Sequence, residues 1–359
     1  MPSAKKNKHN KKSKPQVSVE QLVEAADQAA DPEQALRLFG AALQNTQDPS
    51  LLVDIHEKRA TIHVSLQQID KAMKDYECAL ALVKEPERQA GLLMYMGQLS
   101  QGEEALAFYR QAIEYLEKID DRRQLATVYC TAAELYLTDL CFADDAEQQC
   151  ETYLQQALQI DSELPDALQT CASLRLSQRR PADAVDMILK AFESMKEGCQ
   201  ALATLVGLRE DPASEQRAVE LVQVENVQNL PEYEFRCETA KILLECASLD
   251  QKPEECLQAA IDVLGSLLAE NDEVVEVWAL IGDAFAALMN SELAKHYWDR
   301  ALEMLVTVQK SLEEQQQLGI EDDDEEEELN QELEEVTCQI ETVKNKLEKL
   351  GPETIRVSS

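Results

Sequence analysis

The chain has 359 residues, of which 45% are hydrophobic and 5% aromatic, with only 10 glycines and 11 prolines. A low content of helix breakers among many Leu, Ala, Glu and Gln residues is typical of an all-α protein. The formal net charge of −35 argues against nucleic acid and anionic membrane surfaces as direct partners and favours basic ones, although acidity that only maintains solubility is the alternative.

The N-terminal residues are strongly basic. Residues 1–14 contain six lysines and no acidic side chain, so we expect residues 1–16 to form a disordered basic arm. The arm either binds an import receptor as a nuclear localisation signal or has no specific partner. No hydrophobic stretch follows it, and no apolar run reaches the roughly 18 residues that cross a bilayer. We therefore expect no signal peptide and no membrane span.

Residues 17–310 repeat a pattern of small and bulky side chains. In "VWALIGDAFAALMNSELAKHYWDRAL", Trp278 and Gly282 precede Ala294 and Trp298 at the spacings of a tetratricopeptide (TPR) helix pair. The small residue of one helix lets the partner helix approach, and the bulky residue one turn away fills the space beside it.

The same register recurs along the array, and in two further units the paired small residues are twelve positions apart. Weaker copies fill the gaps, and the long interval after residue 184 predicts a degenerate unit around Ala218. The predicted fold is an all-α tetratricopeptide-repeat α-solenoid, a right-handed superhelix of about seven to eight helix pairs with a C-terminal capping helix. The residues predicted to make the close contacts are Ala60, Ala72, Tyr76, Ala172, Ala184, Trp278, Gly282, Ala294 and Trp298.

Beyond the repeats we predict an acidic linker over residues 311–328 and an amphipathic helix over 329–351, followed by a disordered tail over 352–359. Apolar residues recur in the helix at alternating spacings of four and three. This helix either caps the last repeat in a monomer or pairs in a coiled-coil dimer. The linker holds a run of eight carboxylates that is either a solvated spacer or a mobile extension of an anionic binding surface. The run consists of Glu321, Asp322, Asp323, Asp324, Glu325, Glu326, Glu327 and Glu328.

The predicted binding surface is the groove lined by the first helix of each pair. Most of the charged residues at the positions beside the packing residues are acidic, so the groove is expected to be anionic and to suit an extended or helical basic segment. Ordinary solvated helix-surface acids are the alternative. The predicted partner-binding residues are Asp54, Glu57, Glu134, Asp166, Glu234, Glu245, Glu276 and Asp283.

The sequence offers no motif for catalysis, a cofactor or a metal. It has no Walker loop, no GxGxxG, no GxSxG and no Cys/His nucleophile arrangement. The ten cysteines include no CxxC pair, and we expect them to be reduced, buried small hydrophobes. The four histidines form no metal-binding motif, although His56 and His63 share one helix face. We therefore predict a binding protein and no enzyme.

Several segments resemble the family of TPR assembly chaperones of large-subunit ribosomal protein four. They are "DDAEQQCETYLQQAL", "LPEYEFRCETAKILLE" and "SLLAENDEVVEVWALIGDAFAAL", and the basic N-terminus and acidic C-terminal segment follow the same order. The resemblance implies a cytoplasmic and nuclear chaperone that captures its newly made client, shields a long basic internal loop and escorts it to the nucleus. A TPR histone chaperone and a TPR scaffold in a multi-protein complex are the alternatives.

Overall fold

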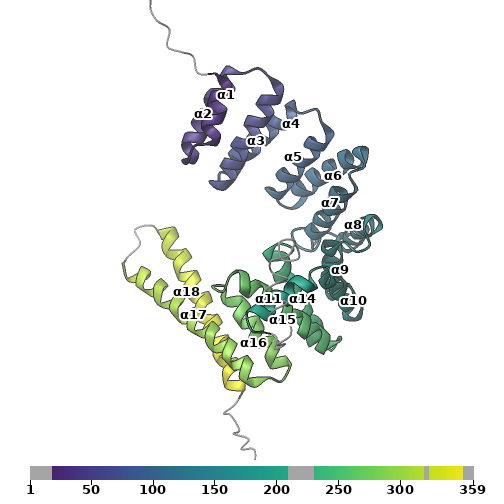
Figure 1. Cartoon of the computed structure of the whole chain (residues 1–359), viewed down its shortest axis with the longest axis vertical. Coiled ribbons are helices and arrows are strands. Elements are labelled where there is room, and N and C mark those ends of the chain that lie inside the picture. The colour runs from purple at the N-terminus through teal and green to yellow at the C-terminus, as the bar shows by residue number, and fades with distance from the viewer. Residues whose placement is uncertain (1–17, 209–229, 319–322, 351–359) are drawn as a thin grey trace, which may run out of the picture. The chain divides into compact units, whose positions relative to one another are not determined.

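The computed structural model describes residues 18–208, 230–318 and 323–350. Over these residues it contains sixteen α-helices and no strand. The chain divides into two compact units, Met1–Gln156 and Ala157–Ser359 (Figure 1). The predicted basic arm, the predicted tail and the unit expected around Ala218 lie outside the described residues.

The first unit is built from antiparallel helix pairs, and its last helix runs on past the boundary between the units. In the first three pairs the second helix packs against the first, and each of these pairs contacts the next helix along the chain. The helices are α1 (Val19–Asp27), α2 (Pro32–Asn45), α3 (Pro49–Ser65), α4 (Ile69–Leu82), α5 (Pro86–Gln98), α6 (Gly102–Ile119), α7 (Arg122–Leu135) and α8 (Ala146–Ile160).

Helices in this unit begin where the sequence supplies caps and prolines. Ser18 and Gln21 form a reciprocal capping box at the start of α1. The Asp31 carboxylate accepts hydrogen bonds from the first-turn amides of α2, directly before Pro32. Proline lacks an amide hydrogen, so the first helical turn, where no intrahelical acceptor exists, is the place where it costs least.

The two helices of a pair approach closely where a glycine faces an aromatic ring. A Cβ added to Gly97 of α5 would lie 2.5 Å from Cε1 of Tyr109 in α6. In the second unit a Cβ on Gly282 would lie 2.3 Å from Cδ1 of Trp298. Each ring therefore occupies the space that any larger residue would need, which is the packing that the repeat pattern predicts.

The residues predicted to make close contacts are buried with one exception. Ala60, Ala72 and Ala294 have no exposed surface, and Trp298 is buried against Gly282. Trp278 is only partly buried, because its indole lies near the helix end, where Nε1 donates a hydrogen bond to the carbonyl oxygen of Asp272 at 2.8 Å.

The second unit adds helices to the paired pattern. Its helices are α9 (Pro165–Ser177), α10 (Pro181–Glu193), α11 (Lys196–Leu205), α14 (Tyr233–Ser248), α15 (Pro253–Glu270), α16 (Val275–Ala287), α17 (Ser291–Leu318) and α18 (Asp323–Lys349). Among the described residues of this unit, α9 pairs with α10, α14 with α15 and α16 with α17, while α11 and α18 stand outside the pairs.

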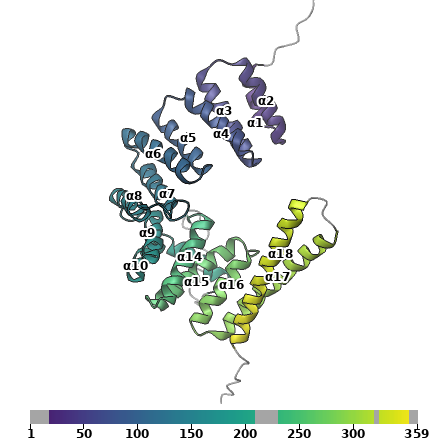
Figure 2. The same cartoon turned by 180° about the vertical axis from the view of Figure 1, so that it is seen from behind.

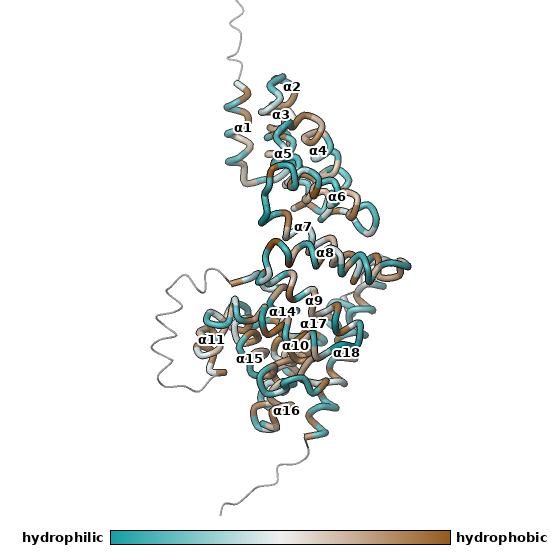
Figure 3. Tube along the Cα trace, turned by 90° about the vertical axis from the view of Figure 1, so that its right-hand side faces the viewer, coloured by the Kyte–Doolittle hydropathy of each residue, from teal (hydrophilic) through white to brown (hydrophobic). Residues whose placement is uncertain are grey.

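Helix α11 packs on α15, while α14 contacts α10 directly. A Cβ on Gly265 of α15 would lie 2.6 Å from Cβ of Ala203 in α11, so the two helices are in close contact. Twelve of the 18 residues of α15 are buried as a result. Figure 3 shows hydrophobic and hydrophilic residues mixed along the individual helices, and none of the described helices is long and apolar enough to cross a membrane.

The boundaries of the predicted acidic linker over 311–328 are corrected by the structure. Helix α17 continues to Leu318, and α18 already begins at Asp323. Residues 311–318 are rich in Glu, Gln and Leu, which are strong helix formers. Residues 323–328 are all acidic, and acidic residues are stabilising in the first turn of a helix. Glu321 and Asp322 lie outside the described residues.

Helix α18 takes the predicted capping position. It lies antiparallel along α17 (Figures 1 and 2). The apolar stripe of α18 is buried at Leu329, Val336, Ile340 and Val343, all within the core of the second unit. The apolar residues that recur at alternating spacings of four and three thus pack against the same chain and cover the last repeat.

The expectation that all the cysteines are buried is wrong for three of them. Cys78, Cys141 and Cys338 are exposed. Others follow the expectation, and burial raises the pKa of Cys199 to about 11 and that of Cys256 to about 12.

We expect iodoacetamide at about pH 8 to alkylate Cys78, Cys141 and Cys338 first, because a thiol must be accessible and ionised to react. Cys199 and Cys256 should react only after unfolding, since both are buried and keep their protons at this pH. Peptide mass spectrometry after timed labelling distinguishes them, and rapid native labelling of Cys199 would contradict the packing of α11 on α15.

Two glycines of α5 provide a matched test of the close packing. Gly97→Ala should lower the free energy of unfolding by about 1–3 kcal/mol, because the added methyl group collides with Tyr109. Gly91→Ala, in the same helix with nothing within 4 Å of the added atom, should raise it by up to about 1 kcal/mol. Denaturant unfolding measures both free energies. Equal changes in the two variants would show that the contact between Gly97 and Tyr109 does not determine stability.

Candidate functional site

The predicted partner-binding acids all lie on the first helices of their pairs. In the first unit, α3 carries two of them and α7 carries Glu134. In the second unit they lie on α9, α14 and α16. All eight are at least partly exposed. Each unit therefore has its own set of surface carboxylates, and the two sets differ in how they are paired.

In the first unit two of the predicted acids are bound to a cation of the same chain. Arg88 of α5 donates from Nε and Nη2 to both carboxylate oxygens of Glu57 at 2.7 Å, and from Nη2 to Asp54 at 2.5 Å. The pKa of Arg88 is raised, chiefly by the hydrogen bond to Glu57. These three groups together carry a formal charge of −1, so this part of the surface is much less anionic than the sequence suggests.

In the second unit two further acids are paired. Lys241 lies 2.8 Å from Glu276, and this hydrogen bond is the main cause of the raised pKa of Lys241. Asp283 accepts a hydrogen bond from Nζ of Lys346 at 2.7 Å and another from the Trp298 indole at 3.0 Å. The capping helix α18 thus supplies the cation for the last of the predicted acids.

The remaining predicted acids of the second unit stand in solvent. Asp166 lies in the first turn of α9, and Glu234 lies in the first turn of α14. Glu234 and Glu245 share one face of α14 with Glu238, because the spacings of four and seven residues bring them back to the same side. All four side chains are exposed. Lys241 lies on the same face of α14 but is bound to Glu276, so these exposed acids make this part of the surface predominantly negative.

The two histidines that share a helix face meet one buried carboxylate. His56 Nδ1 lies 2.7 Å from Asp75 Oδ1, and His63 Nε2 lies 3.7 Å from Asp75 Oδ2. Arg59 approaches the same carboxylate at 3.5 Å. The cluster joins α3 to α4. Across the described residues, no group of three or more His, Cys, Asp or Glu side chains is placed to hold a metal ion.

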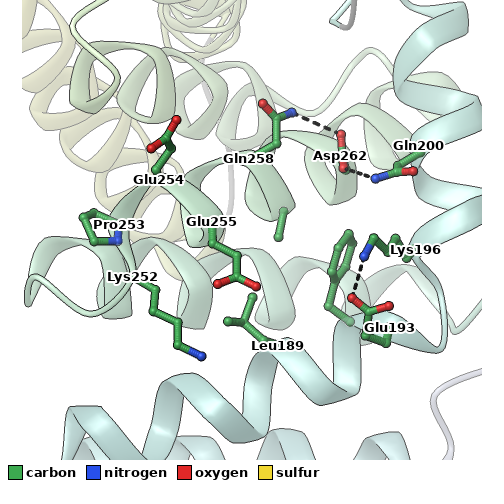
Figure 4. Close-up of a pocket in the computed structure, with 12 residues that line it drawn as sticks. Leu189, Glu193, Lys196, Gln200, Lys252, Pro253, Glu254, Glu255, Gln258 and Asp262 are labelled. Atoms are coloured by element: carbon green, nitrogen blue, oxygen red, sulfur yellow. Dashed lines mark hydrogen bonds and ion pairs between the residues drawn. The ribbon is translucent and has the colours of Figure 1, made fainter.

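A pocket of about 680 Å³ lies among α10, α11 and α15, away from all predicted positions (Figure 4). Several of its polar groups are bound within the chain: Lys196 pairs with Glu193 at 2.6 Å, and Asp262 accepts hydrogen bonds from Gln200 and Gln258. The pocket exists because α11 packs on α15, a contact between distant segments that spacing could not predict.

The segment "LPEYEFR" has a structural role that the sequence alone did not reveal. Arg236 is only 3% exposed. Its Nε donates to the carbonyl oxygen of Pro231 at 3.0 Å, its Nη1 donates to Ser266 at 2.9 Å, and its Nη2 pairs with Glu270. One guanidinium therefore ties the entry of α14 to the C-terminal half of α15.

Antiparallel helix pairs with glycine–aromatic contacts and a capping helix define an all-α TPR solenoid. No family model matches the chain. Comparison with individual proteins nevertheless confirms the resemblance to the TPR assembly chaperones of ribosomal protein four.

Two curated proteins are both called "Probable assembly chaperone of rpl4". The one from Schizosaccharomyces pombe is 28% identical over 232 residues, which cover 62% of this chain and 60% of that protein. The one from Emericella nidulans is 27% identical over 231 residues, covering 62% of this chain and 52% of that protein. The chain thus spans between half and two thirds of the length of these relatives.

A solved structure, "Assembly Chaperone of RpL4 (Acl4) (Residues 1-338)", is 25% identical with a TM-score of 0.53. The match covers 77% of this chain and 98% of that one. The chain is therefore similar, in sequence and in fold, to TPR assembly chaperones of ribosomal protein four.

The Arg236 network is testable with a matched arginine. Arg236→Ala should lower the free energy of unfolding of the second unit by about 2–4 kcal/mol, because buried acceptors lose their donor and a cavity remains. Arg180→Ala removes an arginine that is 52% exposed and contacts its near neighbours in sequence, Asp183 and Gln178, so it should change stability by less than about 0.5 kcal/mol. Denaturant unfolding compares them, and equal losses would refute the structural role of Arg236.

Proposed function

We propose that the chain is a dedicated chaperone that binds newly made ribosomal protein L4, shields its basic internal loop and escorts it to the nucleus for ribosome assembly. The observation that carries the proposal is the similarity to three proteins that are called assembly chaperones of this client. The role is one of binding, with no catalytic step, cofactor or metal.

Exposed acids on the first helices support a charge-complementary mode of binding. Asp166, Glu234 and Glu245 present carboxylates to solvent, and a basic segment laid across them exchanges water and counterions for ion pairs. Such a segment is otherwise unfolded and prone to bind nucleic acid. Ribosomal RNA carries denser charge than this surface, so RNA can displace the chaperone when the client reaches its site.

The paired acids narrow the surface that we assign to charge recognition. Arg88, Lys241 and Lys346 already neutralise part of the predicted groove, and a client cation would have to displace them. We therefore assign the electrostatic contacts chiefly to the exposed acids of α9 and α14. The lysine arm at residues 1–16 as an import signal, the monomeric state and the role of the acidic run at 321–328 remain predictions.

Charge reversal tests this mode of binding. The double variant Asp166→Lys with Glu245→Lys should weaken L4 binding about tenfold or more and reduce its salt dependence, because attraction becomes repulsion. The control variant, Glu77→Lys with Asp299→Lys, makes the same change in net charge at exposed positions on the second helices α4 and α17, and it should bind almost normally.

Isothermal titration at low and high salt provides the measurement. Equal loss in both variants would show that only net charge matters, and no loss in either would reject the electrostatic mode. If the wild-type chain binds a histone pair in preference to L4 in a competition titration, the proposed client is wrong.

A further inference from the structure

The first unit contains an apolar pocket at positions where the sequence predicts part of the anionic groove. The pocket has a volume of about 500 Å³ and lies between α3, α4 and α5. Its α3 wall includes Glu57, Thr61 and Val64, and its opposite wall is formed by Tyr95 and Leu99. A pocket of this size accommodates one or two side chains of an extended segment.

The floor of the pocket is an aromatic stack. The rings of Tyr76 and Tyr95 lie 5.9 Å apart between centroids and within 12° of parallel. Tyr76 is 5% exposed, whereas Tyr95 is 55% exposed. A large aromatic side chain that is half open to solvent and held in place by a buried ring is the kind of preorganised surface on which binding energy concentrates.

Both charged residues that line the pocket are already paired with residues of the same chain that lie outside the pocket. Glu57 is held by Arg88 through two hydrogen bonds of 2.7 Å. Lys58 is bound to Asp27 at 2.5 Å. A client cation would have to compete with the two-point contact of Arg88, whereas an uncharged side chain covers Tyr95 without breaking any ion pair.

We propose that this pocket receives an aromatic or branched aliphatic side chain of the basic client, and that it thereby selects which basic segment binds. The inference rests on the proposed function. An uncharged occupant leaves both ion pairs at the pocket in place, that of Glu57 with Arg88 and that of Lys58 with Asp27. Charge then supplies attraction at the exposed acids, and the pocket supplies discrimination among segments of similar charge.

The test uses the full-length chain and L4 in titrations at low and high salt. Tyr95→Ala should weaken binding about tenfold or more at both salt concentrations, because the lost contact is apolar. Tyr95→Phe keeps the ring and should bind within about twofold of wild type. Phe142→Ala removes an aromatic side chain that is 96% exposed outside the pocket, and it should have no effect.

A second variant distinguishes loss of the pocket contact from misfolding of Tyr95→Ala. Thr61→Lys keeps both aromatic rings, although it removes the Thr61 hydrogen bond to Tyr76, and it places an ammonium group at the exposed wall of the pocket. It should also weaken binding, in a chain that thermal unfolding shows to be folded at the temperature of the titration. Normal binding by both Tyr95→Ala and Thr61→Lys overturns the inference.

Two further outcomes would count against the inference or against the proposed function. A loss in Tyr95→Ala that is accompanied by a weaker salt dependence also overturns the inference, because it means that the client places a cation on the ring. Failure of the wild-type chain to bind L4 rejects the proposed function itself, and the pocket as a client site with it.

Discussion

Close approach of two helices at a small residue is the contact on which the structure depends. At Gly97 and Gly282 the partner ring lies where a Cβ would be, and at Gly265 a backbone-to-methyl contact brings α11 onto α15. Interiors are packed as densely as organic crystals, so such contacts fix helix separation and leave little freedom in crossing angle. The first-helix side chains are presented at fixed positions as a consequence.

The strongly acidic composition does not translate directly into a strongly anionic site. Acids of the predicted groove meet Arg88, Lys241 and Lys346 across neighbouring helices. Arg88 and Lys241 each join the first helices of two successive pairs, and Lys346 joins α18 to α16. Each cation therefore contributes both to stacking and to lowering repulsion between carboxylates. Half-exposed pairs of this kind add little stability each, but they decide which acids remain available to a partner.

Features encoded by local spacing could be predicted from the sequence, whereas features that require distant contacts could not. The interval between Ala60 and Ala72 and the stripe beginning at Leu329 depend on helix periodicity, and both predict the observed packing. The pairing of acids with Arg88 and the burial of Arg236 depend on which helices become neighbours. The linker boundary failed because a run of carboxylates indicates a solvated segment equally in a helix and in a loop.

The end of the array shows how capping and recognition are linked. Helix α18 covers the last repeat with Val336, Ile340 and Val343, and the same helix brings Lys346 to Asp283, with its ammonium group 5.8 Å from the centre of the Trp298 ring. A solenoid end without a cap would expose both an apolar face and an uncompensated carboxylate. One helix thus covers the apolar face and pairs the carboxylate of Asp283, whereas Asp166 on α9 and Glu234 and Glu245 on α14 stay exposed.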